Sequence, residues 1–346
     1  MNSRRLEQIL DRAPAKRLLV LGDLMLDEFV WGKVGRISPE APVPVVQVTA
    51  ESFLPGGAAN VARNLREFTE CVSVAGMIGH DHHGYQLRQL LAEQKIDILN
   101  STATNNFCTI VKTRIIARHQ QVVRVDREQI AGPSRAQLNK IVVEVEKQLA
   151  KTDAIIFEDY GKGFLSDELI TRVTRAARRQ GKIVTADPNA TRLLNWRGMT
   201  AVKPNRTEAF LAAGIPCRDS AESPERDVDL ARAGKTLLRE WDAQNVLITL
   251  GEQGMMLFQP RKSPQHIPTK ARQVFDVSGA GDTAIALFTL ALACGATPLE
   301  AAEMANHASA VVVGKLGTAT VSRDELMASF QSDADYRQIG SRVSRP

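Results

Sequence analysis

The sequence predicts an α/β fold in which helices cover both faces of a mostly parallel central sheet. From residue 134 onward, segments of helical length alternate with short apolar runs, which is the order typical of a parallel sheet. Residues 18–21 form a continuous apolar run, which is followed by Gly22 and Asp23. A strand buried on both faces reads in this way when it opens onto a site at its carboxyl end.

A small second β-sheet is expected beside the main one. Residues 28–50 alternate large apolar with smaller or polar side chains and contain Pro42 and Pro44. Because proline is confined to the edges of sheets, we expect antiparallel strands there, outside the main sheet. Residues 107–127 alternate in the same way and are predicted to form a hairpin that turns at His119-Gln120-Gln121.

The remaining elements follow from the same patterns, and the chain is expected to form a single large domain over residues 1–346. An amphipathic helix is expected within 1–16, and a small-residue helix after the glycines of 54–65. Strands are expected at 72–77, 154–157, 183–186, 202 and 246–250. Helices are expected at 85–94, 134–150, 166–180, 205–213, 226–241 and 280–294.

The composition argues for a soluble protein that acts on small anionic molecules. The chain has 346 residues, with 44 Lys+Arg against 39 Asp+Glu and a net charge of +5. The basic excess forms no tract and aromatic residues make up only 5%, so a nucleic-acid partner is not expected. The four cysteines are scattered and no apolar run reaches membrane length. We therefore expect free thiols, a cytoplasmic location and no membrane partner.

The stretch DVSGAGDT at residues 276–283 is the main candidate for chemistry. A strand-like lead-in at 273–275 precedes it and an Ala/Leu-rich segment follows, so that free backbone N–H groups would point at an anion. Gly279 and Gly281 would let a phosphate approach that backbone. Asp282 repels a phosphate and is expected as the base for an attacking hydroxyl. The alternative is a carboxylate that stabilises a helix start beside tight-turn glycines.

Polar side chains follow several of the predicted strands. They occur in residues 159–163, 187–189, 203–208 and 249–254. In open α/β sheets, ligands bind outside the carboxyl ends of the strands. We therefore expect these four stretches to share one site.

Other motifs were weighed against simpler explanations. Gly234-Lys235-Thr236 resembles the end of a P-loop, but Asp229 replaces the first glycine, and no G-x-G-x-x-G follows the first strand. His80, His82 and His83 with Asp81 suggest a metal site, but a solvated turn before the 85–94 helix is favoured. The hairpin arginines could hold a phosphate, although a charged outer face explains each of them more simply. They are Arg114, Arg118, Arg124 and Arg127.

Four motifs in order resemble those of the ribokinase-like (PfkB) family of carbohydrate kinases. Residues 56–65 resemble its amino-terminal signature and residues 276–283 its carboxyl-terminal one. Gly79-x-Asp81-x-x-Gly84 and Asn205-x-x-Glu208 lie between them, and the resemblance covers about residues 15–330. It implies a three-layer α/β/α sandwich with a β-sheet lid, formed here by 28–50 and 107–127. In that family the lid closes over the sugar and often pairs two subunits, which implies a homodimer.

The resemblance also implies roles for individual residues. Asp282 would be the catalytic base, and the N–H groups of Gly279, Ala280 and Gly281 would form an anion hole. Asn205 and Glu208 would organise Mg²⁺ and the ATP phosphates, partly through water. The ATP path would be lined by Asn189, Lys203, Thr249, Gly251 and Gly254, with Asn306 beside the adenine or ribose. Activation by a monovalent cation is left open.

Three further stretches resemble the members of that family that act on a heptose phosphate. They are residues 22–27, 31–45 and 159–163. The implied substrate is D-glycero-β-D-manno-heptose 7-phosphate, phosphorylated on its anomeric oxygen to the 1,7-bisphosphate for ADP-heptose and lipopolysaccharide synthesis. The sugar would be bound by Asp23, Asp27, Gly56, Gly57, Asn60 and Asp159. Its 7-phosphate would meet Arg36, Arg118 or Lys162. No nucleotidyltransferase motif is present, so a stand-alone kinase is expected.

Two alternatives stay open at this point. The same chemistry could serve another sugar or sugar phosphate. A non-catalytic sensor of nucleotide or sugar could use the same fold, although a sensor has no use for a base beside the phosphate.

Overall fold

A computed structural model describes residues 1–99, 103–104, 107–118, 120–189, 191–218, 222–271 and 274–331. Its main feature is a nine-stranded sheet with the order β15-β14-β13-β12-β11-β10-β1-β4-β6. The pairs from β13 to β6 are parallel, and β14 and β15 add two antiparallel pairs at one edge. The strands are β1 Arg17–Gly22, β4 Cys71–Ala75, β6 Asp97–Ile98, β10 Ala154–Glu158, β11 Ile183–Asp187, β12 Ala201–Val202, β13 Val246–Thr249, β14 Met255–Phe258 and β15 Gln265–Ile267.

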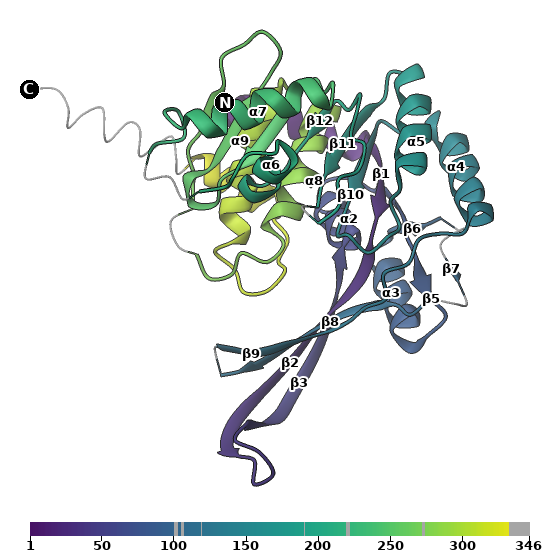
Figure 1. The fold of residues 1–346 in the computed structure, drawn as a ribbon, viewed down its shortest axis with the longest axis vertical. Coiled ribbons are helices and arrows are strands. Elements are labelled where there is room, and N and C mark those ends of the chain that lie inside the picture. The colour runs from purple at the N-terminus through teal and green to yellow at the C-terminus, as the bar shows by residue number, and fades with distance from the viewer. Residues whose placement is uncertain are drawn as a thin grey trace, which may run out of the picture.

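The central strands are buried on both faces, as their continuous apolar runs predict. In β1, Leu18 and Val20 join one hydrophobic cluster, while Leu19 and Leu21 join the cluster on the other face. A strand with apolar side chains on both faces needs a layer on each side. This is why the sheet lies in the middle of a three-layer structure (Figure 1).

The helices divide between the two faces of this sheet. One face packs against α1 Ser3–Leu10, α2 Ala58–Arg66, α3 His82–Glu93, α8 Ala280–Ala293 and α9 Pro298–Val312. The other packs against α4 Arg135–Leu149, α5 Asp167–Arg179, α6 Arg206–Ala212 and α7 Val228–Glu240. Helix α8 is apolar on nearly all sides and is buried from Asp282 to Leu292, so its amino terminus is fixed deep in the molecule.

A separate four-stranded sheet, called the small sheet below, projects from the carboxyl ends of the main strands (Figure 1). Its order is β3-β2-β8-β9, with β2 Leu24–Ile37, β3 Pro44–Gly57, β8 Ile110–Ala117 and β9 Gln120–Arg127. Strands β2 and β3 are antiparallel, and so are β8 and β9. The predicted strands outside the main sheet are therefore present, and they begin and end several residues beyond 28–50. The predicted turn residue His119 lies outside the described residues.

Two local predictions were wrong. Helix α3 begins at His82 and not at 85, because the Asp81 carboxylate accepts the Gly84 N–H at 2.7 Å and caps it. The strand-like lead-in to α8 is not a strand at Val274 and Phe275, whose side chains are exposed; Gln273 lies outside the described residues. A two-residue pair, β5 Ile78–Gly79 with β7 Ala103–Thr104, was not predicted.

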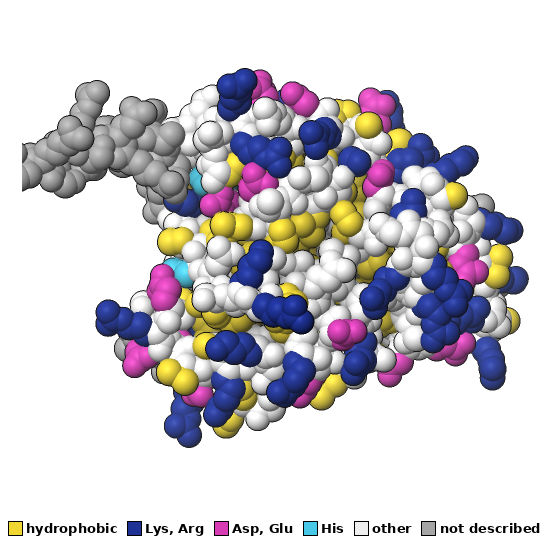
Figure 2. All heavy atoms as spheres, turned by 90° about the horizontal axis from the view of Figure 1, so that it is seen from above, with side chains coloured by type: hydrophobic (Ala, Val, Ile, Leu, Met, Phe, Trp, Pro, Cys, Tyr) yellow, Lys and Arg dark blue, Asp and Glu magenta, His cyan; other side chains and the backbone are white. Residues whose placement is uncertain are grey.

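The remaining surface is mixed, with exposed apolar side chains such as Ile130, Leu193 and Val228 among the charged ones. Figure 2 views the end of the molecule opposite the small sheet, where Lys and Arg side chains are spread widely and gather toward the side of α4 and α5. Within the described residues, no helix combines the length and apolar character needed to cross a bilayer.

Candidate active site

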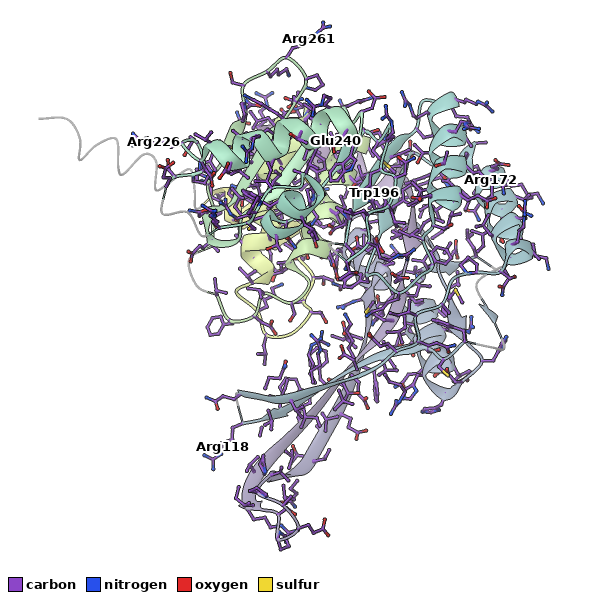
Figure 3. The ribbon with its side chains drawn as sticks, in the orientation of Figure 1. Arg118, Arg172, Trp196, Arg226, Glu240 and Arg261 are labelled. Atoms are coloured by element: carbon purple, nitrogen blue, oxygen red, sulfur yellow. The ribbon has the colours of Figure 1, made fainter. Side chains whose placement is uncertain are left out.

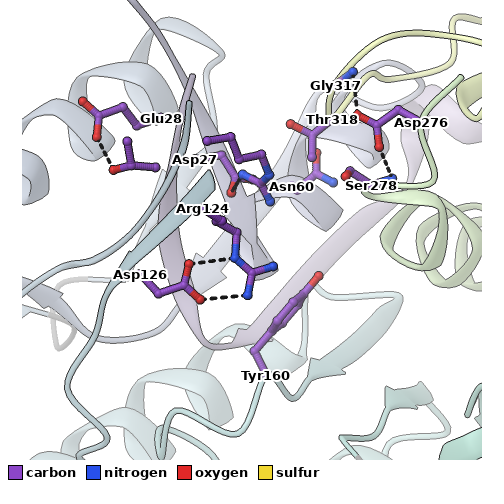
Figure 4. Close-up of polar contacts among 12 residues, drawn as sticks. Asp27, Glu28, Asn60, Arg124, Asp126, Tyr160, Asp276, Ser278, Gly317 and Thr318 are labelled. Carbon is purple, nitrogen blue, oxygen red and sulfur yellow. Dashed lines mark hydrogen bonds and ion pairs between the residues drawn. The ribbon is translucent and has the colours of Figure 1, made fainter. Parts of the chain in front are cut away.

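The glycine turn before α8 leaves its first backbone N–H groups free of side chains. Gly279 is the N-cap residue with φ of 78°, a left-handed conformation that favours glycine. A Cβ there would come within 2.9 Å of Asn60 Nδ2. The Asp276 carboxylate fixes the turn by accepting the N–H groups of Ser278 at 2.9 Å and Gly317 at 3.1 Å (Figure 4). The turn therefore presents the positive end of a buried helix to an anion.

Asp282 lies in the first turn of that helix and is 5% exposed. Both of its carboxylate oxygens are held. Asn60 Nδ2 donates to Oδ2 at 2.7 Å, and the Tyr160 hydroxyl donates to Oδ1 at 2.7 Å. Burial raises the pKa of Asp282, and these two donors oppose that rise by stabilising the charged form.

Further carboxylates surround Asp282 at the ends of β10 and β11. Burial raises the pKa of Glu158, and the nearby charges of Asp187 and Asp282 raise it further. Asp187 forms an ion pair with Lys203, whose Nζ lies 2.7 Å from Asp187 Oδ2. Burial lowers the pKa of the Lys203 ammonium, but the charge and hydrogen bond of Asp187, together with the charges of Glu208 and Glu158, raise it above its usual value. Lys203 is thus a buried cation that is surrounded by acidic side chains.

The loop after β10 is shaped by Asp23. Its carboxylate accepts three backbone N–H groups, from Tyr160 at 3.0 Å, Lys162 at 2.9 Å and Phe164 at 3.2 Å. Within that loop, Asp159 Oδ1 accepts the Gly161 N–H at 2.9 Å. Burial is the main reason why the pKa of Asp159 rises to about 6. Asp23 therefore acts on the site by holding the loop that carries Tyr160.

A cavity of about 540 Å³ opens beside Asp282. Ten of the predicted site residues line it: Asp159, Asn189, Lys203, Asn205, Glu208, Thr249, Gly251, Gly279, Gly281 and Asp282. Asn205 and Glu208 meet at the start of α6, where the Asn205 side chain accepts the Glu208 N–H at 2.9 Å and Glu208 Oε2 accepts the Asn205 N–H at 2.7 Å. Asn205 and Glu208 lie close together, as predicted, because they form a reciprocal helix cap.

A second cavity of about 610 Å³ continues from the first and shares Thr249, Gly251 and Gly281 with it. Ala280, Gly254 and Asn306 line its far part, together with Val274 and Val277. The Asn306 side chain donates to Pro268 O at 2.7 Å and is thereby fixed in the wall. Val274, one of the two apolar residues that were predicted as a strand, thus lines a cavity. Such a wall suits the base of a nucleotide.

The small sheet reaches the site from the opposite side. Arg114 Nη1 lies 2.6 Å from Asp27 Oδ1, and both side chains are largely buried. Arg114 was expected on a charged outer face, and that interpretation was wrong because the Asp27 carboxylate draws it inward. Gly56 leaves room for Asp27, since a Cβ on this glycine would come within 2.5 Å of Asp27 Oδ2.

Eight predicted sugar or phosphate residues line neither cavity: Asp23, Asp27, Arg36, Gly56, Gly57, Asn60, Arg118 and Lys162. Arg36 and Arg118 are exposed and lie toward the far part of the small sheet, and Figure 3 shows Arg118 pointing away from the body. Lys162 forms an ion pair with Glu128 at 2.5 Å. Within this chain, Arg36 and Arg118 are therefore not brought to Asp282.

The histidine-rich turn is held by Asp81. Its Oδ2 accepts the Thr109 N–H at 2.7 Å, while Oδ1 caps α3. Among the residues that the structure describes, no three His, Cys, Asp or Glu side chains are grouped as a metal would require. Asp81 therefore links α3 to the segment before β8.

Sequence reasoning missed Glu158 and Lys112 at the site, and it gave no role to Tyr160 and Asp187, although their stretches were expected to share it. Glu158 and Asp187 end parallel strands beside Asp282, and their position alone could have signalled them. Tyr160 and Lys112 come from a loop and from the small sheet, with Lys112 Nζ 4.8 Å from the centre of the Tyr160 ring. No local sequence pattern predicts the contact between Lys112 and Tyr160.

The arrangement can support transfer of a phosphoryl group. It combines an anion-facing helix start, a fixed carboxylate beside it, a polar cavity and a connected cavity with an apolar wall. Such transfer depends mainly on positioning and charge neutralisation.

Comparison with known proteins agrees with this geometry. Residues 15–325 match the profile of the pfkB family carbohydrate kinases. The bifunctional protein HldE of Desulfatibacillum aliphaticivorans is 41% identical over 315 residues, which cover 91% of this chain and 63% of that protein. HldE of Citrifermentans bemidjiense is 42% identical over 328 residues, covering 95% and 66%. The chain thus spans slightly less than two thirds of the length of these relatives.

Solved structures with a similar fold include two sugar kinases. Phosphofructokinase-2 of Escherichia coli in complex with potassium has a TM-score of 0.73 at 18% identity, covering 92% of this chain and 98% of its own. Arabidopsis thaliana ribokinase complexed with ribose and ATP has a TM-score of 0.68 at 21% identity, covering 91% and 98%. These similarities confirm the predicted ribokinase-like fold with its separate small sheet.

Proposed function

This chain belongs to the pfkB family of carbohydrate kinases, and we propose that it transfers the γ-phosphoryl group of ATP to the anomeric hydroxyl of D-glycero-β-D-manno-heptose 7-phosphate. The product would be the heptose 1,7-bisphosphate, a precursor of ADP-heptose for lipopolysaccharide. That the protein is a sugar-kinase phosphotransferase follows from the family. The choice of acceptor is supported by the similarity to HldE proteins at 41–42% identity.

The observation that carries the proposed mechanism is the position of Asp282. It lies in the first turn of α8, beside the glycine turn, and lines the polar cavity. A phosphate drawn to the helix start would therefore be next to a carboxylate whose two oxygens are already oriented.

In the proposed reaction, Asp282 accepts the proton of the acceptor hydroxyl. The sugar oxygen then forms a bond to the γ-phosphorus, while the bond between that phosphorus and the β–γ bridging oxygen breaks and ADP leaves. The N–H groups of Gly279, Ala280 and Gly281 would stabilise charge on the transferred group. Lys203, already at the cavity wall, would supply a fixed positive charge near the phosphates.

The donor set fits a divalent cation. Five carboxylates line the first cavity, from Glu158, Asp159, Asp187, Glu208 and Asp282, against the cations Lys203 and Arg206. Glu158 Oε2 and Asp159 Oδ2 are buried without a hydrogen-bond partner among the described residues. Such a cavity repels a bare polyphosphate. Mg²⁺ held by one or two carboxylates together with the phosphates and water would neutralise charge on ATP, and Glu208 with Asn205 would border it.

The acceptor would lie between Asp282 and the small sheet. Asp27, Gly56, Gly57 and Asn60 approach that space from β2, β3 and α2, and we assign them to sugar hydroxyls. Asp159 would border the sugar from the loop that Asp23 holds. Of the three cations predicted to meet the 7-phosphate, Lys162 is the one that lies on the loop held by Asp23. Arg36 and Arg118 could reach the 7-phosphate only if the small sheet moved, or if the two arginines came from a neighbouring subunit.

The remaining expectations are part of the same proposal. The small sheet is proposed to act as a lid and to pair two subunits, since β9 is an exposed edge strand on which every residue is accessible. ATP is proposed to occupy the second cavity with its base beside Asn306. A cytoplasmic location, activation by a monovalent cation, a single domain and a stand-alone kinase all stay predictions.

A panel of acceptors tests the proposed substrate. ADP release would be measured with the anomerically pure heptose 7-phosphate, fructose 6-phosphate, fructose 1-phosphate, ribose and a nucleoside at fixed ATP and Mg²⁺. We expect kcat/KM to be at least about 100-fold higher for the heptose phosphate, since a site whose polar groups pair with the hydroxyls of one sugar rejects acceptors that leave those groups unpaired. Preferential turnover of another acceptor would contradict the substrate. ATP binding without turnover of any acceptor would favour the sensor.

A further inference from the structure

Tyr160 contacts both the small sheet and Asp282, the proposed base. It follows β10 in the loop that Asp23 holds by its backbone, including the N–H of Tyr160 itself at 3.0 Å. Its hydroxyl donates to Asp282 Oδ1 at 2.7 Å, over a separation of 122 residues. In Figure 4 the hydroxyl of Tyr160 is directed toward the side of Asn60.

Lys112 is the residue of the small sheet that contacts the Tyr160 ring. It lies on β8, opposite Asp27 of β2 and Asp126 of β9 in the strand register. Its Nζ is 4.8 Å from the centre of the Tyr160 ring, within the range of a cation–π contact. The small sheet therefore contacts the loop through a charged group that lies over the tyrosine.

We propose that Tyr160 is a positioning residue for the base, and that Lys112 makes this positioning depend on where the small sheet lies. This inference rests on the proposed role of Asp282. The Tyr160 hydroxyl fixes Oδ1 while Asn60 fixes Oδ2, so the carboxylate cannot rotate about its own bond. The Asn60 amide is itself oriented, because its Oδ1 accepts from Arg63 Nη1 at 3.3 Å.

Donation from Tyr160 also keeps the base charged among other acids. The charged groups that face Asp282 come from four elements: Asp27 of β2, Glu158 of β10, Asp187 of β11 and Lys203 after β12. Three of these four are carboxylates, which favour a proton on Asp282. Burial raises the pKa of Tyr160 well above its usual value, and the carboxylates of Asp282, Glu158 and Asp187 raise it further. Tyr160 therefore stays a neutral donor, and its hydrogen bond favours the ionised form of Asp282.

The Tyr160→Phe substitution tests this role, with Tyr85→Phe as the matched control. Tyr85 is 63% exposed on α3, far from Asp282 in the fold. We expect Tyr160→Phe to lower kcat about 10- to 100-fold, the factor that a hydrogen bond to a charged group is worth, with KM for the sugar little changed. Because the carboxylate loses a donor, the acidic limb of kcat against pH should move to higher pH. Tyr85→Phe should leave both unchanged.

Lys112→Met tests the contact from the small sheet. If Lys112 acts through Tyr160, its substitution should lower kcat in the wild type and have no further effect in a Tyr160→Leu background. A rise in KM of equal size in both backgrounds would mean that Lys112 meets the substrate directly, and would overturn its role in positioning.

The outcomes separate this inference from the proposed function. The variants are assayed with whichever acceptor the wild type turns over, and also as slow ATP hydrolysis without a sugar. If Asp282→Asn is inactive while Tyr160→Phe keeps the wild-type kcat and pH profile, the inference about Tyr160 is wrong and the base is unaffected. If Asp282→Asn keeps wild-type activity, the base assignment fails and the role of Tyr160 falls with it.

Discussion

Lys203 Nζ lies 2.7 Å from Asp187 Oδ2, and the two side chains are only 3% and 12% exposed. The pair joins the end of β11 to the segment after β12, directly below the glycine turn. Gly281 is close to it, since a Cβ there would lie 3.6 Å from Lys203 Nζ and 3.8 Å from Asp187 Oδ2. Lys203 is thus the fixed cation at the point where the carboxylates gather.

Replacing Lys203 by Met should destabilise the fold strongly. Asp187 would be left buried without its partner, and removing one member of such a pair costs about 3–5 kcal/mol. Urea unfolding at pH 7 measures the change. The control is Arg232→Met, which removes an exposed i,i+3 pair with Asp229 and should change the free energy of unfolding by less than about 1 kcal/mol. Equal effects of the two substitutions would contradict this view of Lys203.

Asp159 should make the protein less stable as pH rises through the mildly acidic range. Its pKa is raised from 3.8 to about 6, mainly by burial, so the folded state binds this proton more tightly than the unfolded chain. The resulting stabilisation is full below pH 4 and is lost as pH rises through 6. It amounts to at most about 3 kcal/mol, at 1.36 kcal/mol for each pKa unit.

Asp159→Asn cannot ionise and should therefore flatten the dependence of unfolding free energy on pH between 4 and 6. Urea titrations at several pH values measure the slope. Asp97→Asn, an exposed position on β6, is the control and should keep the wild-type slope. An unchanged slope for Asp159→Asn would show that Asp159 titrates as it does in the unfolded chain.

Two glycines of the turn should respond differently to alanine. At Gly281 the added Cβ meets its neighbours at ordinary contact distance, so stability should stay within about 1 kcal/mol. The methyl group would nevertheless occupy the approach of the phosphate, and kcat should fall about 10²- to 10³-fold, as when an anion-hole donor is lost.

At Gly279, alanine should lower the stability of the fold as well as the activity. Its φ of 78° and the approach of a Cβ to 2.9 Å from Asn60 Nδ2 both oppose a side chain. Gly279→Ala should lose about 1–3 kcal/mol of stability. Melting curves and steady-state rates of both variants check the contrast; a stable, fully active Gly281→Ala would exclude phosphate binding at this turn.

Arg114→Met should weaken sugar binding more than it slows turnover. It removes the 2.6 Å contact that fixes Asp27 Oδ1, so Asp27 would have to be ordered by the sugar itself. We expect KM for the acceptor to rise about 10-fold, since a charged hydrogen bond contributes about 1.5–3 kcal/mol, while KM for ATP is unchanged. Arg172→Met on α5, which removes an exposed pair with Glu168, is the control. A rise in KM for ATP alone would contradict the role of Asp27.

The main sheet and the place of Asp282 at the start of a helix could be predicted because their signals are local. Leu18 to Leu21 are apolar without interruption since they face cores on both sides. Asp282 was found because the glycines that admit a phosphate lie beside it in sequence. The small sheet was found from alternation and prolines, although its strands run farther than 28–50.

The contacts that orient the base could not be predicted from local patterns. Asn60 and Tyr160 lie 222 and 122 residues from Asp282 in the chain, and only the packing of α2 and of the loop after β10 brings them together. Val274 and Phe275 led to the wrong prediction of a strand, because apolar residues also occur outside sheets, as Val274 does in a cavity wall. The start of α3 was missed because residues 80–83 were interpreted as a solvated turn and the capping role of Asp81 was overlooked.

The measurement that tests the central claim most directly is the activity of Asp282→Asn beside its affinity for nucleotide. Asparagine keeps the size of the side chain but cannot accept the proton of the sugar hydroxyl. We expect turnover to fall about 10²- to 10⁴-fold, the usual contribution of a general base, while the Kd of a non-hydrolysable ATP analogue with Mg²⁺ stays within a factor of three of the wild type. Wild-type turnover by Asp282→Asn would remove this carboxylate from the mechanism.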